Sequence, residues 1–363
     1  MDRRQTTELK GAALILMFWH HLFGCSGFLV PETYNWTPVF GQFDLMLATK
    51  GKLALPLFVV ASGYGLYYAF FQKEKEGIWK RIAKFLITYW TIMFLVAIPY
   101  LWLKGRMDWQ WLPANLVALY HNDSILYVTL SWYVKVYLEI LLVLPLVRKL
   151  QRKVSSIIAE VVFFVLLPLV VARLLPDAES IYVNFATNLL SSLRLLLVWY
   201  PVFHMGLIAA KYKLVERFIQ FVEKHSPLVR TWVIPMLLGM IGMVFSLWLW
   251  NGWNDFFCAF LFLHFFALFV SYCRIEPIHA VLEFLGRYSF QYWLLSGMFF
   301  VNTSDYLWVL FLPRYSVLIC IWSLLILTPF AFSMEKLSGW VYSGVLKVFS
   351  RSDERIAERK EGG

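Results

Sequence analysis

Residues 9–23 read LKGAALILMFWHHLF, an apolar run interrupted by one lysine and two adjacent histidines. At about 100° per residue, the step from Lys10 to His21 comes to roughly three turns plus about 20°, so on one helix both side chains share a face. The rise of about 1.5 Å per residue separates them by about 16 Å along the axis, and His20 falls about 80° off their line. The run therefore predicts a membrane helix with a cation at its inner end and an imidazole near the middle of the bilayer.

Composition places the whole chain among multi-span membrane proteins. Of its 363 residues, 60% are hydrophobic and only 15% are charged, whereas soluble domains carry about 25% charged residues. Apolar stretches of about 20 residues, which is the length that crosses a hydrocarbon core of about 30 Å, recur along the chain. We therefore expect an all-α integral membrane protein with about ten transmembrane helices, over residues 11–30, 53–72, 85–104, 124–147, 154–174, 187–210, 231–250, 255–273, 280–301 and 315–333.

The distribution of basic residues predicts the orientation of this bundle. Most of the 33 Lys and Arg residues fall in segments on one side, and the opposite loops hold only Lys50, Lys52, Lys104, Arg106, Arg173 and Arg314. Because cytoplasmic loops are enriched in Lys and Arg, both termini are predicted to be cytoplasmic. The net charge of +10 is explained by this asymmetry and by attraction to anionic lipid headgroups, so it does not indicate nucleic-acid binding.

The sequence predicts one membrane domain and a short tail. Residues 1–349 form the predicted polytopic domain, and residues 350–363, SRSDERIAERKEGG, form a charged cytoplasmic tail that we expect to be disordered. The four cysteines show no paired spacing and lie in or beside apolar segments. Neither a disulfide framework nor a metal site is therefore predicted, and no permanently bound cofactor is expected.

Polar residues inside the predicted spans are the first candidates for function, because a central Lys or Arg costs about 2.5–3.5 kcal/mol to insert. His20 and His21 lead, since a neutral imidazole is cheaper to bury than a fixed charge and accepts a proton near neutral pH. Ser62 and Gly63 lie near the middle of the second span. They either let another helix approach closely or border a bound substrate.

Charged residues give further candidates. Lys135 and Glu139 are four residues apart in the fourth span, which predicts a structural or site-lining ion pair. Arg194 has no obvious local partner, and it either lines a cavity or extends outward to the interface. Arg81 and Lys84 are three residues apart at the cytoplasmic start of the third span. Topology alone explains cations there, but beside the lysine of the first span they would bind a polyphosphate.

Taken together, these segments resemble the membrane-bound acyltransferase 3 family. The family pattern of a basic residue, ten residues and a histidine is matched here from Lys10 to His21. Its second-span motif is matched by PLFVVASGYGL, residues 56–66. Its next motif has two arginines three residues apart, and here Arg81 and Lys84 occupy those positions. Lysine keeps the charge at the second position but loses the bidentate geometry of arginine.

The resemblance extends from about residue 10 to residue 335 through weaker, mainly apolar patterns. A span bounded by tryptophan and proline is matched by Trp132 to Pro145, and a span ending in glycine by the segment around Gly206. The late motif is matched by LGRYSFQYWLLS, residues 285–296, with Ser296 where many members carry histidine. No role of that histidine is therefore carried over to this chain.

The resemblance implies an enzyme that moves an acyl group, commonly acetyl, from cytoplasmic acyl-coenzyme A to a hydroxyl of an extracytoplasmic glycan or lipid-linked sugar. Under this hypothesis His21 is the catalytic residue, either as a general base or as the acyl acceptor. Lys10, Arg81 and Lys84 bind the donor phosphates, and Ser62 assists as a hydrogen-bonding group. A multi-pass protein of the bacterial cytoplasmic membrane is the expected setting.

Two other classes of protein fit the same features. A transporter or flippase of a lipid-linked sugar or small metabolite would also combine many spans with a basic inner face. It would favour internal pseudo-symmetry or paired half-helices, and the sequence shows neither. A membrane module that kept the fold and lost activity is the third reading. The sequence does not distinguish the acceptor, the acyl group or the oligomeric state.

Overall fold

The fold is described from a computed structural model of the chain, which describes residues 1–24, 36–72, 77–105, 107, 109, 112, 116, 128–175, 185–225, 231–297 and 307–361. Within these residues the chain is helical and contains no strand. An all-helical architecture satisfies each backbone N–H and C=O inside its own segment, which the bilayer interior requires. The all-α expectation is therefore confirmed.

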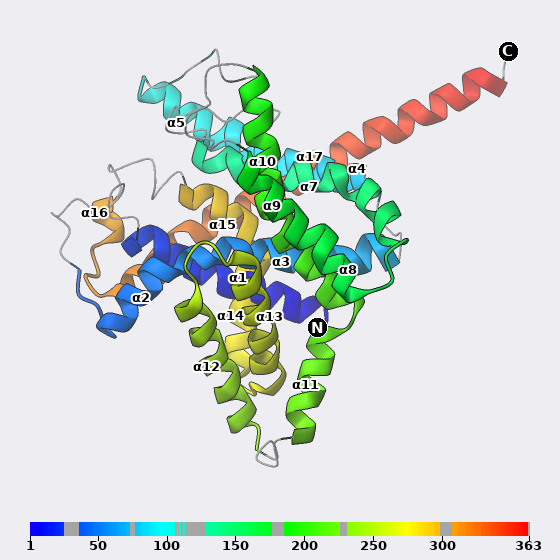
Figure 1. The fold of residues 1–363 in the computed structure, drawn as a ribbon. Helices are drawn as coiled ribbons and strands as arrows, with labels where there is room; N and C mark the ends of the chain where they lie inside the picture. The colour runs from blue at the N-terminus through cyan, green and yellow to red at the C-terminus, as the bar shows by residue number, and fades with distance from the viewer. Residues whose placement is uncertain are drawn as a thin grey trace.

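The helices follow one another along the chain as drawn in Figure 1. Their bounds are α1 (Arg3–Trp19), α2 (Gln42–Lys50), α3 (Ala54–Leu66), α4 (Ile78–Ile92), α5 (Ile98–Leu103), α7 (Val128–Gln151), α8 (Ile157–Val161), α9 (Leu167–Leu174), α10 (Phe185–Lys211), α11 (Leu214–His225), α12 (Val233–Leu249), α13 (Asp255–Tyr272), α14 (Glu276–Arg287), α15 (Ser289–Ser296), α16 (Leu307–Leu310) and α17 (Ser316–Glu361). Turns of π-helix continue several of them, at His20–Gly24, Tyr67–Gln72, Met93–Ala97 and Val162–Leu166, and a 3₁₀ turn, Gly51–Leu53, joins α2 to α3.

Six helical segments in the described residues are long and apolar enough to cross a membrane. They are Gln42–Gln72, Ile78–Leu103, Ile157–Leu174, Leu193–Lys211, Asp255–Tyr272 and Ser316–Lys347. Each overlaps one of the predicted spans. The protein is thus a multi-pass membrane protein, while the count of about ten spans and the cytoplasmic termini stay predictions.

The four remaining predicted spans differ from these six in length or continuity. The helices α1 and α12 have 17 residues each. Residues 124–127, which begin the predicted span 124–147, lie outside the described part of the chain, as do residues 25–30 at the end of the first predicted span. The predicted span 280–301 is divided at Tyr288 into α14 and α15.

Two glycines bring α1 and α14 into backbone contact. A Cβ atom on Gly11 would lie 2.0 Å from the carbonyl oxygen of Leu282, and one on Gly286 would lie 1.8 Å from that of Thr7. Neither position has room for a side chain. Small residues of this kind let membrane helices approach closely, where van der Waals packing replaces the hydrophobic driving force that lipid cannot supply.

The helices α3 and α10 cross in the same way. A Cβ atom on Gly63 would lie 2.0 Å from the carbonyl oxygen of Phe203, and one on Gly206 would lie 2.1 Å from that of Val60. The sequence left open whether Gly63 serves helix packing or borders a substrate. Its contact with the α10 backbone gives it a packing position.

A buried charge pair strengthens the contact between α1 and α14. Glu8 is fully buried, and its Oε1 atom lies 3.0 Å from Nδ1 of His279, whose Nε2 atom lies 2.9 Å from the carbonyl oxygen of Cys273. Burial lowers the pKa of His279, but the hydrogen bonds to Cys273 and Glu8 outweigh it, so that its pKa is raised. With an acceptor facing each ring nitrogen, the protonated imidazole can donate two hydrogen bonds.

The last helix is longer than expected. The helix α17 continues to Glu361 and projects beyond the other helices (Figure 1), whereas composition predicts that residues 350–363 are disordered. Glu, Arg, Lys and Ala are among the best helix formers, and this accounts for the helical continuation.

We expect Gly63→Ala to destabilise the fold by about 1–3 kcal/mol, because the added methyl group overpacks the α3–α10 crossing. Gly339→Ala is the matched control, since Gly339 lies in α17 with open space around a Cβ position. Replacing a helical glycine by alanine should stabilise that site by about 0.5–1 kcal/mol. Apparent Tm in detergent micelles measures both, and an equal response of the two variants would contradict the tight crossing.

A pH dependence follows from His279. Its raised pKa stabilises the fold fully below its unfolded value of about 6.5, and this contribution is lost as pH rises through the folded pKa. The Tm of the wild type should therefore gain more than that of His279→Gln when the pH is lowered from about 8 to about 6. Parallel Tm profiles for the two proteins would remove His279 from this role.

Candidate active site

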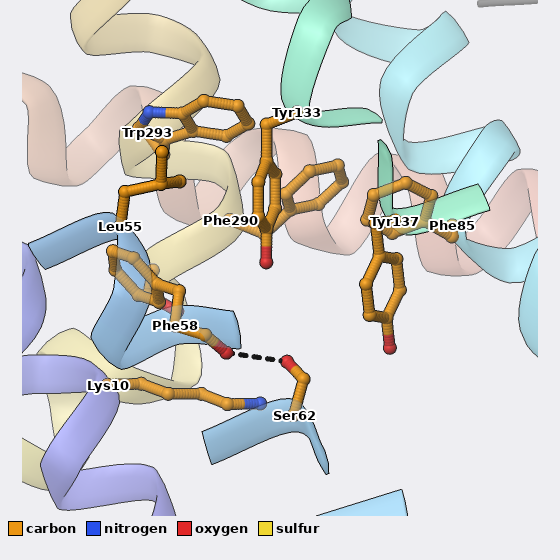
Figure 2. A pocket seen from close by; sticks show the side chains of 10 residues that line it. Lys10, Leu55, Phe58, Ser62, Phe85, Tyr133, Tyr137, Phe290 and Trp293 are labelled. Atoms are coloured by element: carbon orange, nitrogen blue, oxygen red, sulfur yellow. Dashed lines mark hydrogen bonds between the residues drawn. The ribbon is translucent and has the colours of Figure 1, made fainter. Parts of the chain in front are cut away.

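Two adjoining cavities are lined by four of the predicted site residues, Lys10, Ser62, His20 and His21. One of them, named the inner cavity after the predicted cytoplasmic side, has a volume of about 170 Å³ and is lined by Lys10, Leu55, Phe58, Ser62, Phe85, Tyr133, Tyr137, Ser289, Phe290 and Trp293 (Figure 2). The outer cavity has a volume of about 130 Å³ and is lined by Met17, His20, His21, Gly51, Lys52, Ala54, Leu55, Phe58, Trp293 and Gly297. Lys10 and His21 therefore line different cavities. Leu55, Phe58 and Trp293 belong to both, so these three side chains form a shared wall.

The helix α1 aims Lys10 into the inner cavity. An Asp2 cap starts the helix, since the Asp2 carboxylate accepts from the Gln5 amide N–H at 2.8 Å and Gln5 bonds back to the Asp2 N–H. Gly11 lies against α14, and its neighbour Lys10, about 100° around the helix, points elsewhere. Figure 2 shows the Lys10 side chain extended toward Ser62.

The Lys10 ammonium has no carboxylate within 4.0 Å among the described residues. The Ser62 hydroxyl donates its proton to the carbonyl oxygen of Phe58 at 2.8 Å. The hydroxyl oxygen of Ser62 is thereby left with acceptor capacity only. Ser62 thus faces the cavity as an acceptor beside a cation.

Aromatic rings form the rest of the inner cavity. Phe85 stacks on Phe290 with ring centroids 4.4 Å apart, and it lies 4.8 Å from the ring of Tyr137. Tyr133 meets Trp293 edge to face at 4.6 Å. The hydroxyls of both tyrosines point toward the side of the cavity where the lysine lies (Figure 2). The cavity is therefore apolar on one side and polar on the other.

Both histidines line the outer cavity, at the start of a π-helical turn. After Trp19 the chain continues as a π-helical turn, His20–Gly24. A π turn inserts an extra residue, which changes the side chains that share a face. The sequence predicts His20 as a supporting or pore-lining residue off the line of His21, and in the structure both line one cavity, with ring centroids 5.9 Å apart.

The two imidazoles differ in their hydrogen bonds. His20 has its Nδ1 atom 2.7 Å from the carbonyl oxygen of Ala48, so Nδ1 carries the proton and the other ring nitrogen is an acceptor in the neutral form. The Nδ1 atom of His21 is buried without a hydrogen-bond partner in the described part of the chain. His21 is thus the imidazole that the described residues leave uncommitted.

The two predicted cations of α4, Arg81 and Lys84, have different surroundings. Arg81 lies close enough to Lys10 for electrostatic repulsion and within hydrogen-bonding reach of the Tyr137 hydroxyl. Lys84 is exposed, and its electrostatic partner is Glu335 of α17. Arg81 therefore lies near Lys10 and Tyr137, two residues that line the inner cavity, without lining it itself, and Lys84 faces α17.

Three other predicted residues line neither cavity. Lys135 is buried and is attracted electrostatically by Glu139, which is half-buried. Arg194 is half-buried on α10. Their positions are consistent with a structural contribution within the bundle.

Sequence reasoning missed the aromatic wall and one cation. Tyr133, Tyr137 and Trp293 fall in segments that were compared with the family only as apolar patterns, and periodicity does not reveal which aromatic ring borders a cavity. Lys52 was counted only as a residue of an outer loop. Ser296 was noted for replacing a histidine; it is fully buried, and its hydroxyl donates to the carbonyl oxygen of Trp293 at 2.9 Å.

The described residues contain no group of three His, Cys, Asp or Glu side chains that could hold a metal ion. Among the described residues, Cys258, Cys273 and Cys320 are buried free thiols. The described side chains that line the two cavities supply two imidazoles, two lysine cations, hydroxyls and aromatic rings.

Comparison with known proteins gives one match. No curated protein and no solved structure matches the chain. The family model of the acyltransferase 3 type, described as an acyltransferase domain, matches residues 9–334, nearly the whole chain and both cavities. The chain therefore belongs to the acyltransferase 3 family, and the protein is a membrane acyltransferase.

Proposed function

We propose that the protein transfers an acyl group, expected to be acetyl, from cytoplasmic acyl-coenzyme A to a hydroxyl of a glycan or lipid-linked sugar on the outer side of the bacterial cytoplasmic membrane. The observation that carries this proposal is the pair of adjoining cavities. One is lined by Lys10, which has no carboxylate partner among the described residues, and the other by His21, whose Nδ1 atom has no hydrogen-bond partner among them. Of the described residues, Leu55, Phe58 and Trp293 line both cavities.

The donor binds with its phosphates at the inner cavity. Arg81 lies close enough to Lys10 for electrostatic repulsion, and two close cations attract a polyphosphate more strongly in a partly dehydrated site than in water. The exposed position of Lys84 reduces its proposed part in this contact. The pantetheine arm then passes the aromatic side chains toward His21, which the helix rise places about 16 Å along α1.

The thioester reacts beside His21. As a general base, His21 takes the proton of the sugar hydroxyl while that oxygen attacks the thioester carbonyl; the C–S bond breaks and the coenzyme A thiolate recovers the proton from the imidazolium. In the alternative, His21 accepts the acyl group and passes it to the sugar in a second step. Ping-pong kinetics and a trapped acyl-enzyme distinguish the second route from the first.

Substitution of His21 tests this role directly. We expect His21→Ala to lower kcat by about 10²–10⁴-fold, the usual contribution of a general base. His20→Ala is the matched control from the same cavity, and its loss should stay below about tenfold because the Ala48 carbonyl already holds the His20 N–H. The measurement is transfer of radiolabelled acetyl from acetyl-coenzyme A by purified protein, with a size-exclusion profile for each variant.

Two results would contradict this assignment. A fully active His21→Ala removes His21 from the mechanism, and an inactive His20→Ala beside an active His21→Ala moves the reaction to His20. If the wild type moves labelled sugar across liposomes and cleaves no thioester, the transporter reading replaces the enzyme.

Substitution of Lys10 tests the donor contact. We expect Lys10→Gln and Arg81→Gln each to raise KM for acetyl-coenzyme A by about ten- to a hundredfold, since charge-assisted hydrogen bonds contribute about 1.5–3 kcal/mol. Lys104→Gln is the control, because Lys104 lies over the ring of Tyr100 and lines neither cavity. An effect on KM of the sugar acceptor alone would show that Lys10 and Arg81 do not bind the donor phosphates.

A further inference from the structure

Lys52 is a cation in the wall of the cavity that holds both histidines. It lies in the 3₁₀ turn Gly51–Leu53, which packs against the end of α1. A Cβ atom on Gly51 would lie 2.5 Å from the carbonyl oxygen of Leu16 and 3.1 Å from Cβ of His20. The backbone that carries Lys52 is therefore fixed beside the His20 turn, at the opposite end of α1 from Lys10.

The Lys52 ammonium forms no direct polar contact with the described part of the chain. It makes no hydrogen bond and no ion pair within 4.0 Å there, and its side chain is exposed. Asp255 interacts with it electrostatically, but the Asp255 carboxylate accepts from the indole N–H of Trp250 at 2.6 Å. By contrast, Lys50 donates to the carbonyl oxygen of Trp250 at 2.5 Å and lies over that ring.

The surroundings of Lys52 favour an anion. Among the residues that the structure describes, no aspartate or glutamate lines the outer cavity, and Lys52 lies close enough to His20 to interact with it electrostatically. Cations are also uncommon on this side of the predicted topology, because Lys and Arg concentrate on the cytoplasmic side. An anionic group bound in this cavity would meet a point charge that makes no direct pair with the described residues.

We propose that Lys52 selects an acceptor that carries an anionic group, a carboxylate or a phosphate, near the hydroxyl that receives the acyl group. This inference rests on the proposed function, because it identifies the outer cavity as the place where the acceptor binds. A uronic acid and a sugar phosphate share the required chemistry. The anion binds at Lys52, and the neighbouring hydroxyl then lies toward His21.

The test compares three acceptors that differ only at carbon 6: methyl glucoside, methyl glucuronide and methyl glucoside 6-phosphate. Binding is measured without donor by saturation-transfer NMR, and acyl transfer is measured separately with radiolabelled acetyl-coenzyme A. The full chain is used in nanodiscs of phosphatidylcholine, as the wild type, Lys52→Gln, Lys52→Arg and the control Lys104→Gln. A second set of nanodiscs contains phosphatidylglycerol as a competing source of phosphate.

We expect the wild type to bind at least one of the anionic acceptors about tenfold more tightly than the neutral one. Lys52→Gln should weaken binding of the anionic acceptor and raise its KM, so that the ratio of the two affinities falls toward one. Lys52→Arg should restore the ratio, and Lys104→Gln should leave it unchanged. Equal binding of all three acceptors, binding of neither anion, or an unchanged ratio in Lys52→Gln would overturn the proposal. So would a Lys52 dependence that is confined to phosphatidylglycerol, since it would assign the cation to a lipid headgroup.

The two readouts separate this inference from the proposed function. Selective binding of an anion through Lys52 without thioester cleavage would sustain the anion site and refute the transferase. Acetyl transfer with equal use of the three acceptors would support the transferase and refute the anion site.

Discussion

Backbone contact between helices at glycine is the constraint on which both cavities depend. Successive residues of an α-helix point about 100° apart, so a glycine pressed against one neighbour turns the adjacent side chain toward another. Gly11 lies against α14 while Lys10 enters the inner cavity, and Gly63 lies against α10 while Ser62 faces Lys10. In each pair the glycine fixes one face of the helix for packing, and the polar residue beside it lies on another face, toward the cavity. This explains how Lys10 and Ser62 meet within an apolar bundle.

The inner cavity keeps a cation where the bundle could have neutralised it. Insertion of a lysine into a membrane costs about 2.5–3.5 kcal/mol, and neighbouring carboxylates commonly offset such a cost. The bundle does this elsewhere: Lys211 pairs with the buried Glu160, which also accepts from Gln151 at 3.1 Å. Lys10 has no such carboxylate among the described residues and has Arg81 nearby instead. Two neighbouring cations without a carboxylate repel each other when no ligand is bound. Such a pair is expected at a site whose ligand supplies the negative charge.

Local sequence predicted the parts of the site that depend on a single helix. The α-helical repeat alone predicts that Lys10 and His21 lie on one side of the first helix. In the structure Lys10 lines the inner cavity and His21 lines the adjoining outer cavity. That both histidines line one cavity with Lys52 depends on the packing of the Gly51 turn against the end of α1, which periodicity does not contain. Lys84 faces Glu335, and Glu160 gathers partners from distant segments. Such pairings are set by tertiary packing, which local patterns do not contain.

The wall of Leu55, Phe58 and Trp293 belongs to the proposed chemistry as much as the polar residues do. A continuous polar channel between Lys10 and His21 would admit water from both sides, and water competes with a sugar hydroxyl for a thioester. Large apolar side chains exclude water and strengthen electrostatic attraction on each side. The proposed reaction needs the donor phosphates and the acceptor to stay at opposite ends of α1 while one carbonyl group is shared between them. Two cavities divided by three side chains meet that need better than a single open channel would.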